Sequence, residues 1–275
     1  MERKSQAFGW WDKRLSRLEI RDARTIASNR PDWCKISFLY PGGKAIGSYR
    51  KHDFPRGAAV LEADWAKTPI LCEACRLLGS PLVRNRATIG GNLADASPAA
   101  DLAVPFLALD AEVVIAKKNA EPRRVPIDQL FLDPNKTVLR KDELIEEIWF
   151  PKPTAGMSTV YQKLGLRNAM AISVISMAIL IEIEKDICRK ARIAVGAAAP
   201  VPMRAYNVEK VLTGKTITEK VVERCSSEIA DEVRPISDIR ASAQYRRAMA
   251  RVLLGRLLRK VTTWERNEGN EAIYS

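Results

Sequence analysis

The chain contains, between two apolar stretches, the polar segment Arg84-Asn85-Arg86-Ala87-Thr88-Ile89-Gly90-Gly91-Asn92-Leu93-Ala94-Asp95-Ala96-Ser97-Pro98-Ala99-Ala100-Asp101-Leu102. Glycine has no Cβ, so Gly90 and Gly91 can take positive φ values and turn successive N–H groups toward one point, which suits phosphate oxygens. Thr88, Asn92 and Ser97 add short hydrogen-bonding side chains around that point. The residue types therefore indicate a loop that a ligand can approach closely.

Two interpretations of this segment remain open on its residues alone. In the first, the loop binds a nucleotide, and the Asp101 carboxylate accepts hydrogen bonds from ribose hydroxyls. In the second, the loop is a hairpin or a helix-entry turn, with Ser97 or Asp95 capping a helix that starts near Pro98. The glycine spacing is not G-x-G-x-x-G, so it does not support a Rossmann nucleotide site.

Length and composition limit the classes of protein that this sequence can be. With 275 residues, 47% of them hydrophobic, the chain can hold one large or two medium domains with real cores. No segment reaches the ~20 apolar residues of a membrane span, and no apolar stretch follows the first charged residues as it does in a signal peptide. We therefore expect a cytoplasmic protein without a membrane span.

Cysteine and histidine are scarce, which restricts metal and nucleophile chemistry. The five cysteines are an odd and scattered set, unlike a secreted disulfide framework. Cys72-x-x-Cys75 lies in an apolar helical pattern and has no second pair to complete a tetrahedral metal site, which favours a core position. His52 is the single histidine and has no nucleophile motif beside it. We expect neither a metal site nor a catalytic residue in this chain.

The chain is strongly basic, with 45 Lys+Arg against 33 Asp+Glu and a net charge of +12. Such a balance fits either a nucleic-acid-binding protein or a basic subunit that meets acidic partners. A predicted C-terminal helix carries the densest basic run, Arg246, Arg247, Arg251, Arg256, Arg259 and Lys260. No aromatic residues of the kind that stack on single strands are interleaved with it. A solvated helix face or a subunit contact is the favoured interpretation, and nucleic acid is not expected.

Apolar periodicity predicts two groups of elements. The first group consists of helices at residues 62–78 and 99–109, with Gly79 ending the former, strands at 111–116 and 144–150, and a short segment at 126–132 followed by a turn at 133–135. Pro151-Lys152-Pro153 then marks a domain boundary. The second group consists of strands at 159–164, 172–183 and 191–198, then helices at 205–212, 218–233 and 241–261, with a polar, frayed tail. This order predicts a three-stranded antiparallel sheet with helices on one face.

A family resemblance adds to this reading of the residues. The segment from Gly79 to Asp101 resembles the second FAD-binding segment of the flavoprotein subunit of molybdenum hydroxylases, the family of xanthine dehydrogenase and aerobic carbon monoxide dehydrogenase. The likeness continues in order through Lys136-Thr137-Val138-Leu139, Tyr161-Gln162-Lys163-Leu164, Arg192-Ile193-Ala194-Val195-Gly196-Ala197, Pro200-Val201-Pro202-Met203-Arg204 and Ile236-Ser237-Asp238-Ile239-Arg240-Ala241-Ser242. It covers residues 62–260 and several independent motifs.

The resemblance implies an α+β fold with a two-part FAD-binding domain at residues 1–153. Residues 1–60 would be its abbreviated or garbled first part, and residues 61–153 its second lobe. An α+β C-terminal domain would occupy residues 157–262, and a frayed tail residues 263–275.

The resemblance also implies which residues hold a non-covalent FAD. Thr88, Ile89, Gly90, Gly91 and Asn92 would surround its phosphates. Ser97, Asp101 and Leu102 would lie toward the ribose and adenine, Ile145 would give an apolar contact, and Lys163 would lie near the isoalloxazine; a plain strand-edge lysine is the alternative at that last position. The flavin would take electrons from a small [2Fe–2S] subunit, after hydroxylation at the molybdenum cofactor of a large subunit, and pass them to an acceptor.

Residues 1–60 depart from the family pattern. The family has a first FAD loop of the type Ala-Gly-Gly-Thr-Asp/Asn there, and this chain does not contain one as written. Tryptophan has one codon, so Gly9-Trp10-Trp11-Asp12-Lys13 is encoded GGN-TGG-TGG-GAY-AAR, which permits Ala-Gly-Gly-Thr in the frame that starts at the second base. A frame change near Gly9 is therefore a hypothesis; stops without a strand–helix pattern upstream in that frame would refute it.

Two other functions remain as alternatives. A degenerate paralogue could keep the fold, lack FAD and act in assembly or interaction. A basic nucleic-acid-binding protein is supported by charge alone.

Overall fold

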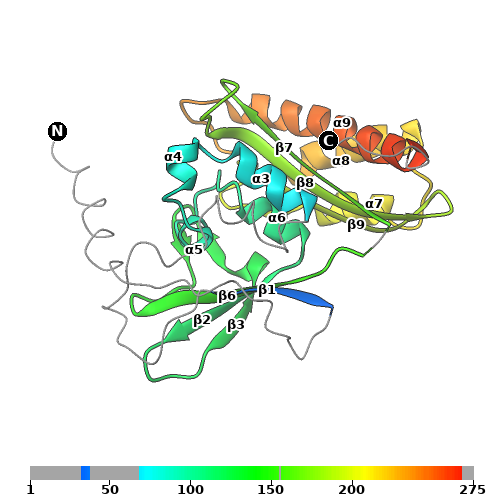
Figure 1. Cartoon of the computed structure of the whole chain (residues 1–275). Coiled ribbons are helices and arrows are strands. Elements are labelled where there is room, and N and C mark those ends of the chain that lie inside the picture. Colours follow the sequence, from blue (N-terminus) through cyan, green and yellow to red (C-terminus); the bar gives the residue numbers. More distant parts are fainter. Residues whose placement is uncertain (1–31, 38–67, 155, 268–275) are drawn as a thin grey trace.

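The computed structural model describes residues 32–37, 68–154 and 156–267 and arranges them in four layers (Figure 1). One layer is a four-stranded antiparallel sheet in the order β1-β6-β2-β3. Its strands are Trp33–Ser37 (β1), Glu143–Pro151 (β6), Glu112–Lys117 (β2) and Arg123–Pro126 (β3). The helices that follow it in space are Pro69–Leu77 (α3), Pro81–Arg84 (α4), Ile89–Ala94 (α5) and Ala103–Ala108 (α6).

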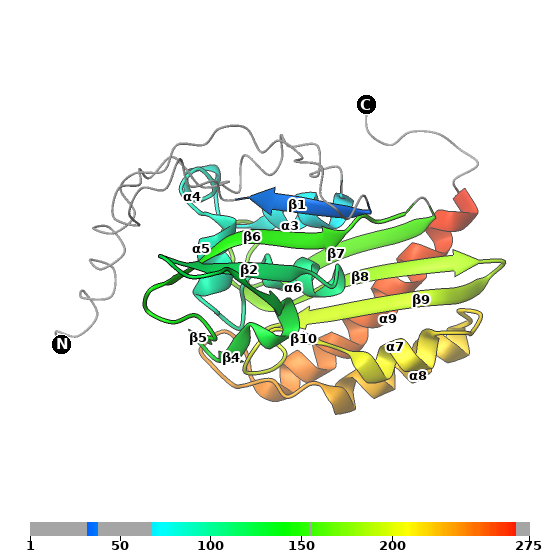
Figure 2. The ribbon, with the colours of Figure 1, turned by 90° about the horizontal axis from the view of Figure 1, so that it is seen from below.

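A second antiparallel sheet, in the order β10-β9-β8-β7, forms the third layer. Its strands are Met203–Arg204 (β10), Ile187–Gly196 (β9), Ser173–Glu184 (β8) and Met157–Gly165 (β7). Helices Tyr206–Leu212 (α7), Glu219–Glu232 (α8) and Ala243–Asn267 (α9) cover its outer face. Seen from below, the first sheet lies in front of α6, and β8 and β9 lie behind it (Figure 2).

Strand β8 explains why the second sheet is covered on both faces. Its residues from Ser173 to Ile181 are all buried and, apart from two serines, apolar, so the strand shows no alternation of apolar and exposed polar residues. Met177 and Ile179 belong to the hydrophobic cluster shared with α7, α8 and α9. Ala178 and Leu180 belong to the cluster shared with α3, α6 and the first sheet. The sheet therefore separates two hydrophobic cores.

The small elements complete the first half. A 3-10 turn, Ile127–Gln129 (η2), precedes a two-stranded sheet of Phe131–Asp133 (β4) and Lys136–Thr137 (β5). Asn135 has a φ of 58° in the turn between these strands, where the sequence predicts one. No helix in the part of the chain that the structure describes is both long and apolar enough to cross a membrane.

The observed elements differ from the predicted ones in several places. Helix α3 begins with Pro69 and is followed by Gly79 at a φ of 51°, as predicted, while residues 62–67 lie outside the described residues. The helix predicted at 99–109 spans only Ala103–Ala108, because Ala100 N–H bonds to Ser97 O in a preceding turn. The second sheet has a fourth, two-residue strand, so the prediction of three strands is wrong. Helix α9 continues beyond the predicted end at Val261 to Asn267.

Candidate cofactor site

The two glycines lie in the first turn of helix α5. Thr88 is the N-cap residue, and its Oγ1 accepts a hydrogen bond of 3.0 Å from Gly91 N. The bond from Asn92 N to Thr88 O, also 3.0 Å, is the first of the helix. Gly90 and Gly91 therefore have helical conformations, and the prediction of positive φ values is wrong; the described glycines with positive φ are Gly79, Gly156 and Gly214. The first turn of a helix already presents N–H groups without intrahelical partners, so no left-handed residue is needed.

The loop does contain a helix entry, but the prediction of a helix start near Pro98 is wrong: α5 begins at Ile89 with Thr88 as its cap, and α6 begins at Ala103. Neither Ser97 nor Asp95 caps a helix at this point. Ser97 Oγ instead accepts a bond of 3.3 Å from Ala99 N within the turn that precedes α6. Asp95 is exposed and follows α5 as its C-terminal cap residue.

Gly91 leaves room for the side chain of Thr88, the N-cap residue. A Cβ atom at this position would lie 2.6 Å from Thr88 Oγ1, inside the distance that real Cβ atoms keep. Because Ile89 and Gly90 precede the first intrahelical hydrogen bond, their N–H groups point out of the helix start. The donor set at this point consists of backbone amides beside a small side-chain hydroxyl, which suits phosphate oxygens.

The loop that follows α5 is fixed on both sides. Asn92 Oδ1 accepts a hydrogen bond of 3.1 Å from Leu102 N, which closes the loop on itself. Asn135 donates from its backbone N–H to Ala96 O at 2.9 Å. Ala197 N, at the end of β9, donates to Pro98 O at 2.6 Å. These bonds come from both halves of the molecule and hold the loop in one conformation.

Asp101 is the centre of a buried polar cluster between the halves. Its Oδ2 lies 2.7 Å from Lys163 Nζ on β7. Its Oδ1 accepts hydrogen bonds from Ser173 Oγ at 3.0 Å and from Tyr161 OH at 3.4 Å. Lys163 Nζ also donates to Leu77 O, at the end of α3, at 3.2 Å. The side chain of Lys163 is 5% exposed and that of Asp101 is 12% exposed.

Burial sets the acid–base properties of this cluster. It raises the pKa of Asp101 above the ordinary carboxyl value, while Lys163, Ser173 and Tyr161 act in the opposite direction. Burial, and next the Asp101 charge, raise the pKa of Tyr161 well above 10. Burial raises the pKa of the Cys75 thiol to about 12. A thiol with so high a pKa is a poor metal ligand, because metals bind the thiolate.

The structure brings most of the predicted site residues together. The bond between Asn92 and Leu102 joins the start of α5 to the segment of Ser97 and Asp101, and the ion pair joins Asp101 to Lys163. Lys163 is thus a buried partner of Asp101 and not a plain strand-edge lysine. Ile145 lies on β6, which α5 contacts, and is packed in the hydrophobic core. Ile89 and Leu102 are almost completely buried as well, which argues against side-chain contact with a ligand.

Two members of the cluster escape prediction from the sequence. Tyr161 stands two residues before Lys163 on the same strand, and the period-2 alternation of strands places both side chains on one face. That spacing could have indicated their association. Ser173 gives no signal, since it is a small polar residue at the start of an apolar run. Within the described ranges, no three His, Cys, Asp or Glu side chains form a metal site.

Both halves of the chain match known protein families. Residues 52–153 match the family described as the FAD binding domain in molybdopterin dehydrogenase. Residues 160–261 match the CO dehydrogenase flavoprotein C-terminal domain. Together the two matches include all of the predicted site residues, from Thr88 to Lys163.

Whole proteins of this kind are also similar. The chain is 32% identical to the glyceraldehyde dehydrogenase medium chain of Sulfolobus acidocaldarius, over 80% of this chain and 76% of that one. It is 32% identical to the xanthine dehydrogenase FAD-binding subunit of Escherichia coli, over 65% of this chain and 61% of that subunit. The solved structure of carbon monoxide dehydrogenase from Hydrogenophaga pseudoflava matches 90% of this chain and 78% of its own, with a TM-score of 0.75 and 27% identity. The chain therefore belongs to the oxidoreductase family of FAD-binding medium subunits of molybdenum hydroxylases.

Proposed function

We propose that this chain holds FAD at the start of α5 and serves as the electron-transfer subunit of a molybdenum hydroxylase complex. One observation carries this proposal: the start of α5, with free backbone amides, the Thr88 cap and Gly91, lies in the same part of the fold as the buried Asp101–Lys163 pair. A bound flavin supplies one- and two-electron transfer between a [2Fe–2S] partner subunit and an acceptor. The chain itself supplies binding and orientation and contributes no catalytic side chain.

Each site residue has a role that its position supports. The amides of Ile89 and Gly90, with Thr88, Gly91 and Asn92, hold the phosphates. The second group comprises Ser97, Asp101 and Leu102 on the ribose and adenine side, Ile145 as an apolar contact and Lys163 near the isoalloxazine. Asp101 already accepts bonds on both oxygens, so its contact with the cofactor uses the remaining lone pair of the carboxylate.

The names of the relatives indicate which partner subunits this chain would have. The relatives are named medium chains or FAD-binding subunits, which are parts of larger complexes. We propose a large subunit with the molybdenum cofactor and a small subunit with [2Fe–2S] clusters as partners, in the cytoplasm. The basic charge of the chain supports contacts with acidic surfaces of such partners.

A degenerate paralogue without FAD is the second candidate, and one specific observation favours it. Residues 1–60 lack the first glycine loop of the family as written, and they lie outside the described residues except for 32–37. If that loop is missing, part of the phosphate cradle is missing too. We therefore expect weaker FAD binding than in a family member with both loops.

Titration of the purified chain with FAD distinguishes the two candidates. Binding gives a flavin absorbance that stays with the protein after gel filtration and a rise in Tm that grows with FAD concentration. Absence of both signals at saturating FAD would contradict the proposed function and support the paralogue.

The variant Gly91→Val tests the location of the site. The branched side chain would displace Thr88 Oγ1 and block the helix start, so we expect FAD binding to be lost and the free energy of unfolding to fall by about 2 kcal/mol. Ala248→Val creates the same branched side chain on the exposed face of α9 and serves as the control. Unchanged FAD affinity in Gly91→Val would show that the site lies elsewhere.

A further inference from the structure

Helix α6 carries a carboxylate just beyond each of its ends. Asp101 precedes the helix and pairs with Lys163 on β7. Asp110 follows it and pairs with arginines of β9 and β10. The helix itself lies between the two sheets, and all of its residues from Ala103 to Ala108 are buried. It packs against β8 and β9 on one side and, through Phe106, against Phe150 of the first sheet on the other.

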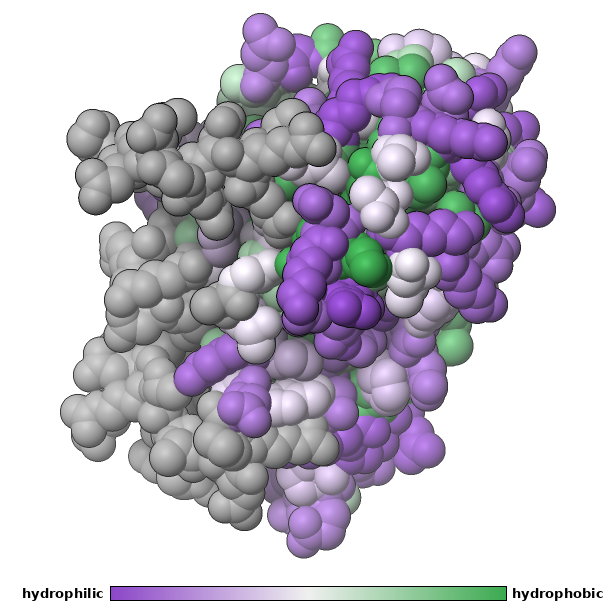
Figure 3. All heavy atoms as spheres, turned by 90° about the vertical axis from the view of Figure 1, so that its right-hand side faces the viewer, coloured by the Kyte–Doolittle hydropathy of each residue, from purple (hydrophilic) through white to green (hydrophobic). Residues whose placement is uncertain are grey.

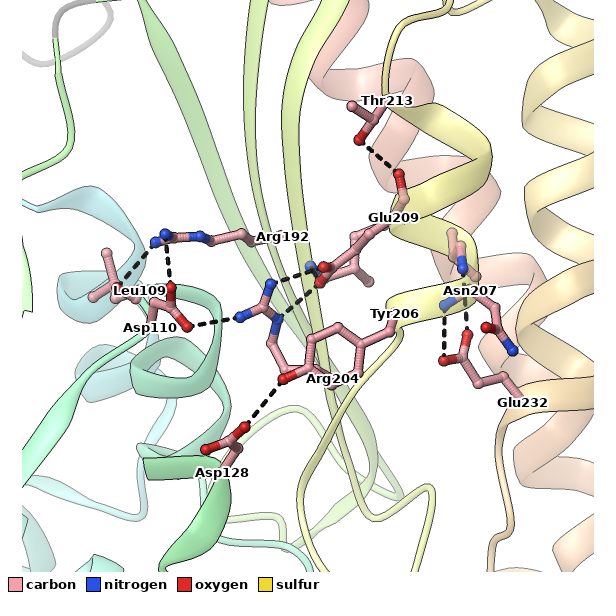
Figure 4. A network of polar contacts seen from close by, with 12 residues as sticks. Leu109, Asp110, Asp128, Arg192, Arg204, Tyr206, Asn207, Glu209, Thr213 and Glu232 are labelled. Carbon is pink, nitrogen blue, oxygen red and sulfur yellow. Dashed lines mark hydrogen bonds and ion pairs between the residues drawn. The ribbon is translucent and has the colours of Figure 1, made fainter. Parts of the chain in front are cut away.

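The contacts of Asp110 form a second bridge between the halves (Figure 4). Its Oδ2 lies 2.8 Å from Arg192 Nη2, and its Oδ1 lies 3.0 Å from Arg204 Nη1. Arg192 also donates from Nη1 to Leu109 O at 3.2 Å. One arginine therefore holds both the side chain of Asp110 and the carbonyl that ends the helix.

Arg204 is itself held in place by the C-terminal half. Arg204 makes a bidentate pair with Glu209, at 2.8 and 2.7 Å, and its guanidinium lies 4.9 Å from the ring centre of Tyr206. Glu209 in turn accepts a bond of 2.8 Å from Ile193 N on β9. The side chain of Arg204 is 8% exposed and that of Arg192 is 13% exposed. The Arg204 side of this bridge is thus built by the C-terminal half without Asp110.

Apolar contacts alone would leave the position of α6 along the sheet weakly defined. Hydrophobic burial is non-directional, whereas ion pairs and hydrogen bonds have preferred distances and angles. A six-residue helix has little backbone bonding of its own to resist a shift or rotation. The ion pairs of Asp110 and Asp101 therefore fix the position of α6 from its two ends.

We propose that Asp110 is a positioning residue for the cofactor loop, acting through helix α6 on residues 97–102. This inference rests on the proposed function, because the loop it positions is the one assigned to FAD. Asp110 touches neither the loop nor the Asp101 cluster. It acts by fixing the far end of the helix, so that Asp101 meets Lys163 and the Leu102 amide meets Asn92.

The variant Asp110→Asn removes the charge without straining the backbone. Asp110 has a φ of 59°, a conformation that asparagine tolerates as well as aspartate does. Arg204 keeps Glu209 as a carboxylate partner, whereas Arg192 loses the carboxylate of its ion pair and keeps its bond to Leu109 O. Asp128→Asn is the matched control: Asp128 on η2 accepts a bond of 3.1 Å from Tyr206 OH, across the same junction, and this bond does not involve α6, although η2 packs against that helix.

Amide hydrogen exchange of the full chain without FAD tests the inference. We expect the amides of Ala100 and Leu102 to exchange about fivefold faster in Asp110→Asn and at the wild-type rate in Asp128→Asn. Arg192→Lys keeps the charge but has one nitrogen in place of the two that contact Leu109 O and Asp110, so it should have a smaller effect in the same direction. Equal exchange in all variants, or equal acceleration in both Asp110→Asn and Asp128→Asn, would overturn the inference.

FAD titration of the same variants separates this inference from the proposed function. If the wild type binds FAD, the dissociation constant should rise about fivefold in Asp110→Asn and stay unchanged in Asp128→Asn. An unchanged dissociation constant in Asp110→Asn overturns the role of Asp110 and leaves the proposed function intact. A wild type that does not bind FAD refutes the proposed function, while the exchange rates still decide whether Asp110 positions the loop.

Discussion

Glu143, at the start of β6, shows how a local hydrogen-bond set changes the acidity of one residue. Arg123 donates to its carboxylate from Nε at 3.1 Å and from Nη2 at 2.8 Å. The backbone N–H of Arg140 donates to it at 2.8 Å. These bonds, those of Arg123 first, lower the pKa of Glu143 to about 2. The pair joins β6 to β3, strands that are not neighbours in the sheet.

The variant Glu143→Gln should change how stability depends on pH. A glutamate in the unfolded chain has a pKa of about 4.3, so the native state holds its proton less tightly. Its contribution is fully present above that pH and is lost as the pH falls toward 2. We expect the variant to be less stable than the wild type by about 1 kcal/mol at pH 7. The difference should disappear as the pH approaches about 2, the pKa of Glu143 in the folded chain.

Urea unfolding across this pH range measures the effect. Glu184→Gln is the control, because the Glu184–Arg189 pair is exposed to solvent. A constant difference between Glu143→Gln and the wild type from neutral to acidic pH would contradict the assignment.

Single residues also show the limit of prediction from the sequence at this site. Thr88, Gly90 and Gly91 fit a left-handed nest and a helix start equally well, and only the cap bond from Gly91 N to Thr88 Oγ1 separates the two. Asp101 and Lys163 are both recognisable as site residues by resemblance. Their ion pair is not, because it joins a loop to a strand of the other half of the chain.

At the scale of elements, helix α9 departs most from its predicted character. The prediction of a solvated basic face is wrong for Arg246, which is 1% exposed. Its Nη1 donates to Ala197 O at 3.0 Å and its Nη2 lies 2.6 Å from Asp238 Oδ1. Arg247 and Arg251 are exposed as expected. Arg246 lies on the same helix face as Ala250 and Leu253, a spacing that could have indicated burial.

The variant Arg246→Met should destabilise the chain by about 3 kcal/mol. It removes the buried partner of Asp238 and of the Ala197 carbonyl, and unpaired buried polar groups are costly. Arg247→Met, the neighbouring exposed position on the same helix, should change stability by no more than about 0.5 kcal/mol. Chemical denaturation of both variants provides the measurement, and equal effects would show that Arg246 is not a structural anchor.

Long elements were predictable and short ones were not. Strands β7, β8 and β9 and helix α8 lie within a few residues of their predicted positions, because each buries enough apolar side chains to show a period. Strand β10 has two residues and exists because β9 offers it a partner. Helix α6 is buried all round, so its apolar run gave no sharp N-terminal limit.

For the whole molecule, the junction between the halves is a continuous core. Tyr161, Ala178, Leu180 and Ala194 of the second sheet belong to the same hydrophobic cluster as the helices and strands of the first half. The carboxylates at Asp101 and Asp110 add directional bonds across it. We propose residues 1–153 as the FAD-binding domain and residues 157–262 as the C-terminal domain, two parts that share one core. The predicted frayed tail at residues 263–275 is wrong for residues 263–267, which continue helix α9.

The whole chain should therefore unfold in one cooperative thermal transition. Separation of the halves would expose the shared cluster and leave buried ion pairs unpaired, so neither half is expected to unfold first. Calorimetry tests this through the ratio of calorimetric to van't Hoff enthalpy, which should be near one. Two resolved transitions would contradict the prediction.

The face of the molecule in Figure 3 is mainly polar, as expected when most apolar side chains lie in the core. On the face seen in Figure 3, hydrophilic residues predominate and the hydrophobic ones form small separate patches. The described turn between β8 and β9 contributes Lys185 and Asp186, both at positive φ and both exposed.

The double burial of β8 has a consequence for how this sequence can change over time. Residues 175, 177, 179 and 181 face one set of neighbours, whereas residues 178 and 180 face another. Substitutions along the strand should thus sort by the parity of the residue number. Between residues 175 and 181, odd positions should co-vary with the outer helices and even positions with the first half of the chain, whereas Ser173 bonds to Asp101 of the first half. The two faces of this one twelve-residue strand are therefore constrained by different sets of neighbouring residues.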